Sequence, residues 1–387
     1  MEAREAFNVK KMIVIGSGIL GASTAYQLAK LGAEVTVVDC GGPGQATDAA
    51  AGIICPWISQ RRNKAWYSLA KSGAHYYKSF INEHEAEGAY DTGYARVGAL
   101  RLHREREKLV ALEKLAVDRR QEAPEMGEIR LLEPDEVKRL FPPLDEGFYA
   151  LYVSGAARVD GRALRESLLR AAVRHGATIV RGEASLLHDG NTVNGVRVGT
   201  EEINADAVAV CAGAWARQLF TPLGLDFQVT YQKAQIVHLS LPDVATEHWP
   251  VVMPPGDQYI LAFDDSRIVI GATHENDPQG YDTRVTAGGL QEVINKALSV
   301  APGLADGSFL EARVGFRPFT PGFLPVVGTV PEWKGIYAAN GLGASGLTMG
   351  PYIGAQLAQL MLGRETEIQL ENYRLHLALS PEFSDNL

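Results

Sequence analysis

The stretch MIVIGSGILG at residues 12–21 joins four apolar residues to the pattern G-x-G-x-x-G. The apolar run predicts a buried strand, and the apolar residues that recur at helical spacing behind it predict a helix that ends near Gly32. A second apolar run at residues 35–38 predicts the next strand, and Asp39 stands at its carboxyl end. Strand, glycine turn, helix, strand and acid in this order predict a dinucleotide-binding unit of the Rossmann type.

Each glycine of this turn has its own role in such a unit. Gly16 permits the tight turn, Gly18 lets the backbone approach a pyrophosphate, and Gly21 lets the helix pack on the strand. The helix N-terminus stabilises phosphate charge, and Asp39 can accept hydrogen bonds from ribose hydroxyls. An acid at this position disfavours the 2′-phosphate of NADP, so NAD and FAD remain as candidates.

The composition narrows the class of protein further. The chain has 387 residues, 46% of them hydrophobic, and a net charge of -9, which fits two domains and disfavours a nucleic-acid partner. Its three cysteines and nine histidines show no metal-ligand spacing, and the cysteines form no even disulfide set, so we expect a cytoplasmic protein without a metal site. No segment reaches the ~18 apolar residues that cross a bilayer, so we expect neither a transmembrane segment nor a cleaved signal.

Behind the first unit the pattern of regular elements changes. Residues 41–54 form a loop of small residues in which Thr47 and Asp48 are helix-capping types, whereas an NAD domain would continue in regular strand and helix repeats. Helices are predicted at residues 66–83, 106–120, 162–175 and 288–300, and again after a strand at residues 336–339 and a glycine-rich turn. Strands are predicted at residues 177–180 and 193–198 around a turn at residues 189–191, at residues 207–211, and through the strand-rich region 227–273.

Four segments together resemble one family of flavoenzymes. They are residues 1–54, the segment GAARVD at residues 155–160 with the helix behind it, VAVCAGAW at residues 208–215, and residues 315–351. The chain resembles the D-amino-acid oxidase superfamily of FAD-dependent oxidoreductases, in the branch of glycine oxidase and sarcosine oxidase, and it is similar to uncharacterised bacterial members. The resemblance implies an α/β (α+β) fold in which a Rossmann-like FAD-binding domain is interleaved with an antiparallel-sheet substrate domain. It places the FAD-binding domain at residues 1–85, 150–222 and 318–387, and the substrate-binding domain at residues 86–149 and 223–317.

The same resemblance implies a non-covalent FAD. Some sarcosine oxidases attach FAD through a cysteine in the segment that matches residues 315–321, and this segment contains none. The second glycine cluster, residues 341–346, would lie beside the flavin ring and place a helix N-terminus near its pyrimidine side. The candidate cofactor-binding residues are Gly16, Gly18, Ile19, Leu20, Gly21, Asp39, Thr47, Asp48, Ala49, Gly52, Ile53, Ala184, Ala212, Gly213, Trp215, Arg317, Gly341, Leu342, Gly343, Ala344, Ser345, Gly346, Leu347 and Thr348.

Arg317, Tyr259 and His274 are the candidate catalytic residues. In the segment RVGFRPFTP at residues 313–321, Arg317 resembles the family's arginine before proline and would bind the substrate carboxylate, since a planar guanidinium meets a carboxylate through two hydrogen bonds. Arg313 is expected to be an ion-paired or surface arginine. Tyr259 matches a tyrosine that contacts the carboxylate in glycine-oxidising relatives, with a core position as its alternative. His274 stands where glycine oxidase has a methionine, and it is either a substrate contact or a structural histidine.

The reaction implied by the resemblance is FAD-dependent oxidation of an α-amino acid or N-alkyl amino acid of the glycine, sarcosine or D-amino-acid type. Hydride passes to the flavin, and the imine then hydrolyses. Val269 occupies the position that matches the lysine used for oxygen chemistry in sarcosine oxidases, so the acceptor is either O2 or another carrier. Two alternatives stay open: dehydrogenation of a 2-hydroxy acid or other carboxylate, and a flavin-binding protein without turnover. The sequence is also compatible with an oligomer.

Overall fold

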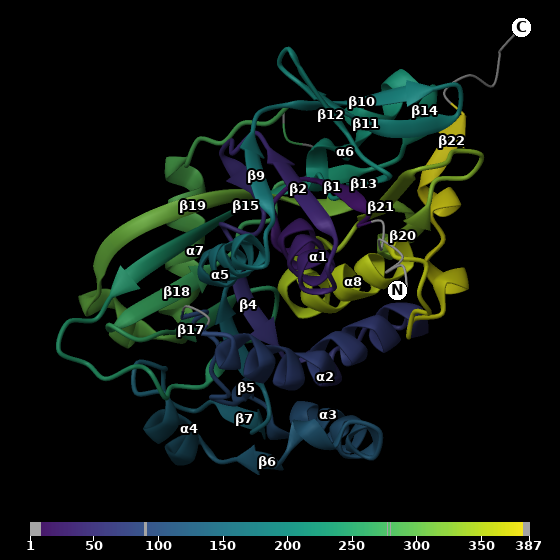
Figure 1. The fold of residues 1–387 in the computed structure, drawn as a ribbon. Helices are drawn as coiled ribbons and strands as arrows, with labels where there is room; N and C mark the ends of the chain where they lie inside the picture. Colours follow the sequence, from purple (N-terminus) through teal and green to yellow (C-terminus); the bar gives the residue numbers. More distant parts are fainter. Residues whose placement is uncertain (1–8, 89–90, 277, 279, 382–387) are drawn as a thin grey trace, which may run out of the picture.

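Two large sheets organise the computed structural model, which describes residues 9–88, 91–276, 278 and 280–381 (Figure 1). The first sheet has six strands in the order β20-β21-β13-β1-β2-β9. Its strands are β1 (Lys11–Ile15), β2 (Glu34–Asp39), β9 (Thr178–Arg181), β13 (Ala207–Val210), β20 (Val326–Thr329) and β21 (Ile336–Asn340). All neighbours run parallel except β20 and β21, which are antiparallel. The apolar runs of β1 and β13 are buried almost completely, as expected for central parallel strands.

The second sheet has nine strands in the order β3-β19-β15-β18-β17-β16-β5-β7-β6. Its strands are β3 (Gly44–Gln45), β5 (Ala99–His103), β6 (Ile129–Leu132), β7 (Tyr149–Val153), β15 (Thr230–Ser240), β16 (Val251–Met253), β17 (Tyr259–Ala262), β18 (Arg267–Gly271) and β19 (Ser308–Phe319). The pairs β16 with β5 and β19 with β3 are parallel, and the other pairs are antiparallel. The mixed α/β fold with one parallel and one antiparallel sheet is therefore confirmed.

Helices cover both sheets. α1 (Ile19–Lys30) packs against α5 (Gly161–Arg174) and α8 (Gly346–Met361), and α8 also contacts α2 (Lys64–Ala86) (Figure 1). α7 (Ala287–Val300) packs on β15 and β18. The remaining α-helices are α3 (Arg106–Arg120), α4 (Pro134–Leu140) and α6 (Ala216–Phe220). None of the helices in the described part of the chain is long and apolar enough to cross a lipid bilayer.

Smaller strand groups complete the fold. β4 (Ala51–Ile54) pairs with β8 (Ala157–Asp160), and β14 (Leu225–Phe227) pairs with β22 (Leu379–Pro381). β10 (Ala184–Asp189), β11 (Thr192–Val198) and β12 (Glu201–Asn204) form an antiparallel sheet. The turn at residues 189–191 therefore joins β10 to β11, and the prediction that it lies between strands 177–180 and 193–198 was wrong. β10 was not predicted, because its side chains are half-buried or exposed and its sequence shows no alternation of apolar and polar residues.

The predicted helices and strands otherwise match the structure, with ends that differ by a few residues. In region 86–149, β5, β6 and α4 were not predicted, and elsewhere β7, β12, β19 and β20 were also missed. The domain limits stay a prediction. β3 and part of β7 fall in segments predicted for the FAD-binding domain, yet both strands belong to the nine-stranded sheet.

The three cysteines differ in accessibility. Cys55 and Cys211 are buried, and burial raises the pKa of each thiol to about 12, whereas Cys40 is exposed. Because the thiolate is the reactive form, we expect a thiol reagent at about pH 8 to modify only Cys40 in the native protein and all three cysteines after unfolding. Mass spectrometry of labelled peptides measures this, and Cys40→Ser is the control that should abolish native labelling. Rapid native labelling of Cys55 or Cys211 would contradict it.

Candidate active site

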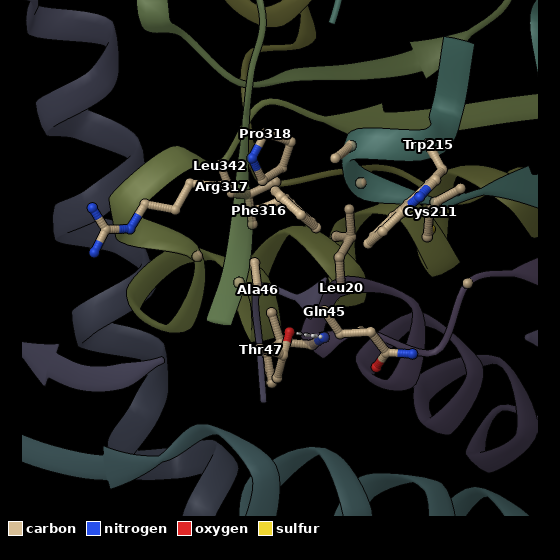
Figure 2. Close-up of a pocket in the computed structure, with 18 of the residues that line it drawn as sticks. Leu20, Gln45, Ala46, Thr47, Cys211, Trp215, Phe316, Arg317, Pro318 and Leu342 are labelled. Carbon is tan, nitrogen blue, oxygen red and sulfur yellow. Dashed lines mark hydrogen bonds between the residues drawn. The ribbon is translucent and has the colours of Figure 1, made fainter. Parts of the chain in front are cut away.

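A cavity of about 810 Å³ is lined by residues from both large sheets. Figure 2 shows Leu20 from α1, the segment 45–47, Trp215, and Phe316, Arg317 and Pro318 from β19 around it. The predicted residues that line this cavity are Gly16, Gly18, Ile19, Leu20, Asp39, Thr47, Ala49, Gly52, Ile53, Ala184, Ala212, Gly213, Trp215, Tyr259, His274, Arg317, Leu342, Gly343, Ala344, Gly346, Leu347 and Thr348. The structure thus brings the two glycine clusters and the three candidate catalytic residues to one cavity.

The first glycine turn divides into packing and lining positions. Gly16 has a φ of +97°, and a Cβ there would lie 2.5 Å from the carbonyl oxygen of Cys211. A Cβ at Gly21 would lie 1.8 Å from the carbonyl oxygen of Gly16, so Gly21 packs the helix on the turn and does not line the cavity. A Cβ at Gly18 would meet only the Thr47 hydroxyl oxygen, at 3.4 Å. The Gly18 backbone therefore faces space that a ligand can fill.

Two long helices begin at the cavity. Gly18 precedes α1 and Ser345 precedes α8, and within the described residues neither of these two N-cap residues bonds to its helix through a side chain. The Ile19 N–H donates to the Thr47 hydroxyl at 2.9 Å, which joins the start of α1 to the second loop. Unsatisfied N–H groups and the helix dipole at such ends favour negative charge. The two ends fit the pyrophosphate of a dinucleotide and the pyrimidine side of a flavin.

Asp39 lines the cavity at the end of β2, close to the start of α1. Its carboxylate accepts hydrogen bonds from the N–H of Ser17 at 2.6 Å, the N–H of Gly41 at 2.5 Å and the side-chain amide of Gln45 at 3.2 Å. These donors fix its orientation beside Ala184, which also lines the cavity. An oriented carboxylate of this kind fits ribose hydroxyls. Gln45 was not predicted, because a glutamine in a glycine-rich loop has no distinguishing pattern.

Four predicted cofactor-binding residues do not line the cavity: Gly21, Asp48, Gly341 and Ser345. Asp48 forms an ion pair with Arg165 at 3.2 Å, so its side chain is used within the protein. Gly341, with a φ of +81°, packs against Thr320. Ser345 directly precedes α8. These four residues therefore shape the turns around the cavity, and residues next to them in the sequence line it.

Arg317 lies on β19, paired in register with Gln232 of β15. Its Nη1 donates to the Gln232 side-chain oxygen at 3.2 Å, and a guanidinium carries further N–H donors that can meet a ligand. Tyr259 pairs in register with Gly271 on the neighbouring strand, and a Cβ at Gly271 would lie 2.5 Å from its hydroxyl. Burial raises the pKa of Tyr259, and a hydrogen bond with Arg317 opposes that shift. The tyrosine is therefore a neutral donor beside a cation, which suits a carboxylate ligand.

His274 follows β18 and also lines the cavity. Its Nδ1 lies 3.0 Å from Oδ2 of Asp257, a residue that was not predicted. Burial and the charge of Arg317 lower the pKa of His274, and Asp257 opposes this only in part. The free enzyme therefore holds a neutral His274 near pH 7.

Aromatic rings cover part of the same cavity. Tyr281 stacks on Trp215 at 5.1 Å and on Tyr231 at 4.6 Å between ring centroids, and it meets Phe316 edge to face. The Tyr281 hydroxyl donates to the carbonyl oxygen of Ala214 at 2.9 Å. Tyr281 was missed because its role depends on rings that lie far apart in the sequence.

Arg313 is an ion-paired arginine, as expected. Arg313 pairs with Glu311 at 2.5 Å and donates to the carbonyl oxygen of Asp48 at 3.1 Å, and it does not line the cavity. Cys211 and Val269 are buried in the apolar core. In the part of the chain that the structure describes, no group of three or more His, Cys, Asp or Glu side chains is arranged to hold a metal ion.

Comparison with known proteins assigns the family. The family model described as FAD dependent oxidoreductase matches residues 11–360. The chain belongs to this family. This FAD-dependent oxidoreductase is 61% identical to the uncharacterized oxidoreductase YurR of Bacillus subtilis and 32% identical to glycine oxidase of Pseudomonas aeruginosa, and each alignment covers 94% of the chain and 98% of the relative.

A solved structure agrees with this family. Iminodiacetate oxidase from Chelativorans sp. BNC1 superimposes with a TM-score of 0.91 at 47% identity, over 94% of this chain and 98% of that one. The oxidoreductase is therefore an FAD-dependent enzyme of the D-amino-acid oxidase fold, as the resemblance implied. The residues that would hold FAD are those at Asp39, the start of α1, and the start of α8.

Proposed function

We propose that this FAD-dependent oxidoreductase oxidises the C–N bond of an α-amino acid or N-alkyl amino acid to the imine. The observation that carries the proposal is the position of Arg317, bonded to Gln232 and adjacent to Tyr259, in the same cavity as the N-terminal ends of α1 and α8. Such a pair binds an α-carboxylate and so fixes the α-carbon. The names of two relatives, glycine oxidase and iminodiacetate oxidase, support an amine next to a carboxylate.

The chain contributes binding and orientation to this reaction. FAD, when bound, supplies the acceptor for the hydride that leaves the α-carbon. Arg317 holds the carboxylate, Tyr259 donates a further hydrogen bond, and the aromatic cover formed by Trp215, Tyr281 and Phe316 limits access of water. We assign no side-chain base, since an amine that arrives deprotonated needs none. The imine takes up water to give an oxo acid and an amine.

An anaerobic titration of the purified holoenzyme tests this function. The panel consists of glycine, sarcosine, D- and L-amino acids and proline derivatives. We expect at least one of these amines to bleach the absorbance of the oxidised flavin. Bleaching by 2-hydroxy acids and by none of the amines would replace the proposal with hydroxy-acid dehydrogenation. A flavin that stays oxidised with every compound would favour a binding protein without turnover. Air is then readmitted to distinguish an oxidase from a dehydrogenase, because oxygen rapidly reoxidises the reduced flavin of an oxidase. Oligomeric state and a cytoplasmic location stay predictions.

A further inference from the structure

Asp257 and the neutral imidazole of His274 are in contact in the cavity, and the oxidation itself does not use this contact. Asp257 precedes β17 and His274 follows β18, and the pairing of these strands brings Nδ1 and Oδ2 to 3.0 Å. The side-chain amide of Gln258 donates to the carbonyl oxygen of Ala272 at 3.0 Å and fastens the two segments together. Asp257 and His274 both line the same cavity as Arg317.

The contact with Asp257 leaves one nitrogen of His274 for a ligand. Nδ1 faces Asp257, although among the described residues it has no hydrogen bond of good geometry, so the contact is electrostatic. Nε2 is then the atom that can meet a bound molecule. Asp257 is also 3.7 Å from Nζ of Lys296, which in turn lies 2.9 Å from Glu292. The charge of Asp257 is thus balanced within the protein and does not require a cationic substrate.

The charges around His274 determine which ligand it suits. The groups that act on it are Arg317, Asp257, Lys296 and Glu292, two cations and two anions. The first carboxylate of a substrate neutralises the charge of Arg317. A second carboxylate in the cavity then needs another positively charged group. His274 can provide that cation by binding a proton, and Asp257 stabilises the resulting imidazolium.

We propose that the substrate is an amino dicarboxylate, and that His274, anchored by Asp257, determines specificity by binding the second carboxylate while Arg317 binds the first. This inference rests on the proposed function, because it names the substrate class of the same site. The second carboxylate can be carried on the nitrogen, as in iminodiacetate, or on the side chain, as in aspartate. Both sources present the same group to His274, and the experiment separates them.

Kinetics with matched substrate pairs test the inference. We compare iminodiacetate with sarcosine, and D- and L-aspartate with glycine, in the wild-type holoenzyme and in His274→Gln. We expect one dicarboxylate to exceed its monocarboxylate partner in kcat/KM on the order of ten- to a hundredfold, the range for a charge-assisted hydrogen bond. His274→Gln should raise KM for that dicarboxylate by a similar factor relative to its effect on KM for sarcosine or glycine. The preferred pair identifies where the second carboxylate is carried.

Inhibitor binding gives a readout that does not depend on turnover. Glutarate replaces the NH of iminodiacetate by CH2, and butyrate replaces the NH of sarcosine in the same way, so neither is oxidised at a C–N bond. We expect glutarate to perturb the flavin spectrum at concentrations at least about tenfold lower than butyrate. Asp257→Asn should reduce this difference, and His274→Gln should remove it.

The pH dependence of glutarate binding has a defined sign. In the free site, burial and Arg317 hold the pKa of His274 below its ordinary value, and a bound second carboxylate raises it. Glutarate affinity should therefore be greatest at low pH and should fall as pH rises through the interval between the two pKa values. Butyrate should show no such fall, and neither should glutarate with His274→Gln.

The outcomes separate this inference from the proposed function. Turnover of sarcosine or glycine without preference for a dicarboxylate overturns the inference alone. If His274→Gln lowers kcat/KM equally for the dicarboxylate and its monocarboxylate partner, or lowers it for neither, the inference is also overturned. If no amine reduces the flavin, both proposals fail. If His274→Gln loses FAD or does not fold, the wild-type enzyme tests the inference. Glutarate that binds no more tightly than butyrate, or whose affinity does not fall as pH rises, overturns it.

Discussion

Replacement of Arg317 by alanine is expected to lower kcat/KM for the carboxylate substrate on the order of a hundredfold, equivalent to about 3 kcal/mol. The guanidinium is held by Gln232 and lies beside Tyr259, so its loss removes a charge-assisted contact and leaves the tyrosine without its cationic neighbour. Most of the effect should appear in KM, since the carboxylate is bound before and during hydride transfer. Arg317→Lys should lose roughly tenfold, because an ammonium keeps the charge and lacks the planar fork.

The matched control is Arg313→Lys, four positions earlier on the same strand. Arg313 pairs with Glu311 outside the cavity, so its replacement should change kcat/KM less than about threefold. Steady-state kinetics and the concentration of amine needed to bleach the flavin anaerobically measure both variants. Unchanged kinetics in a folded, FAD-loaded Arg317→Ala would remove this residue from the site.

Gly21→Ala is expected to lower the free energy of unfolding by roughly 3 kcal/mol or more, and to do so with or without FAD. The added methyl group would lie 1.8 Å from the carbonyl oxygen of Gly16, which is backbone and cannot yield without opening the turn. Chemical denaturation of the apoprotein and of the holoenzyme gives the two free energies. Normal stability of both forms would contradict the packing role of this glycine.

Gly18→Ala is the matched comparison within the same turn. Gly18 has a φ of −63°, which any residue adopts, and its added methyl group would meet only the Thr47 hydroxyl at 3.4 Å. The apoprotein should therefore keep its stability, whereas the dissociation constant for FAD should rise on the order of tenfold because the backbone can no longer approach the pyrophosphate. Flavin fluorescence, which recovers when FAD dissociates, measures the change.

Several of the predicted cofactor-binding residues line the cavity, and their binding of FAD stays a prediction. The turn at Gly16, the start of α1 and Asp39 all follow from one short segment, whose apolar run, glycine spacing and acid have direct structural meaning. The second glycine cluster was placed at the flavin by its resemblance to a family, since a glycine-rich turn before a helix has no single function of its own. Within both clusters, only the three-dimensional contacts separate glycines that line the cavity from Gly21 and Gly341, which pack against the protein.

The substrate end was predicted less completely. Arg317, Tyr259 and His274 came from the resemblance, and the cavity contains all three. Their partners Gln232 and Asp257 had no signal, because a single glutamine or aspartate in a strand-rich region is usually a surface residue. The strands of region 86–149 were missed for a related reason, since short strands of a large mixed sheet carry too few residues to show a period.

The sequence by itself therefore determined the dinucleotide-binding unit, the change from alternating elements to a strand-rich region, and the acidic composition that disfavours nucleic acid. Each of these depends on neighbouring residues along the chain. The tertiary structure decided which side chains meet: strand register places Gln232 against Arg317, 85 positions away, and brings Asp257 to His274. Such pairs form when strands distant in the chain align, and the sequence does not contain that alignment in any local pattern.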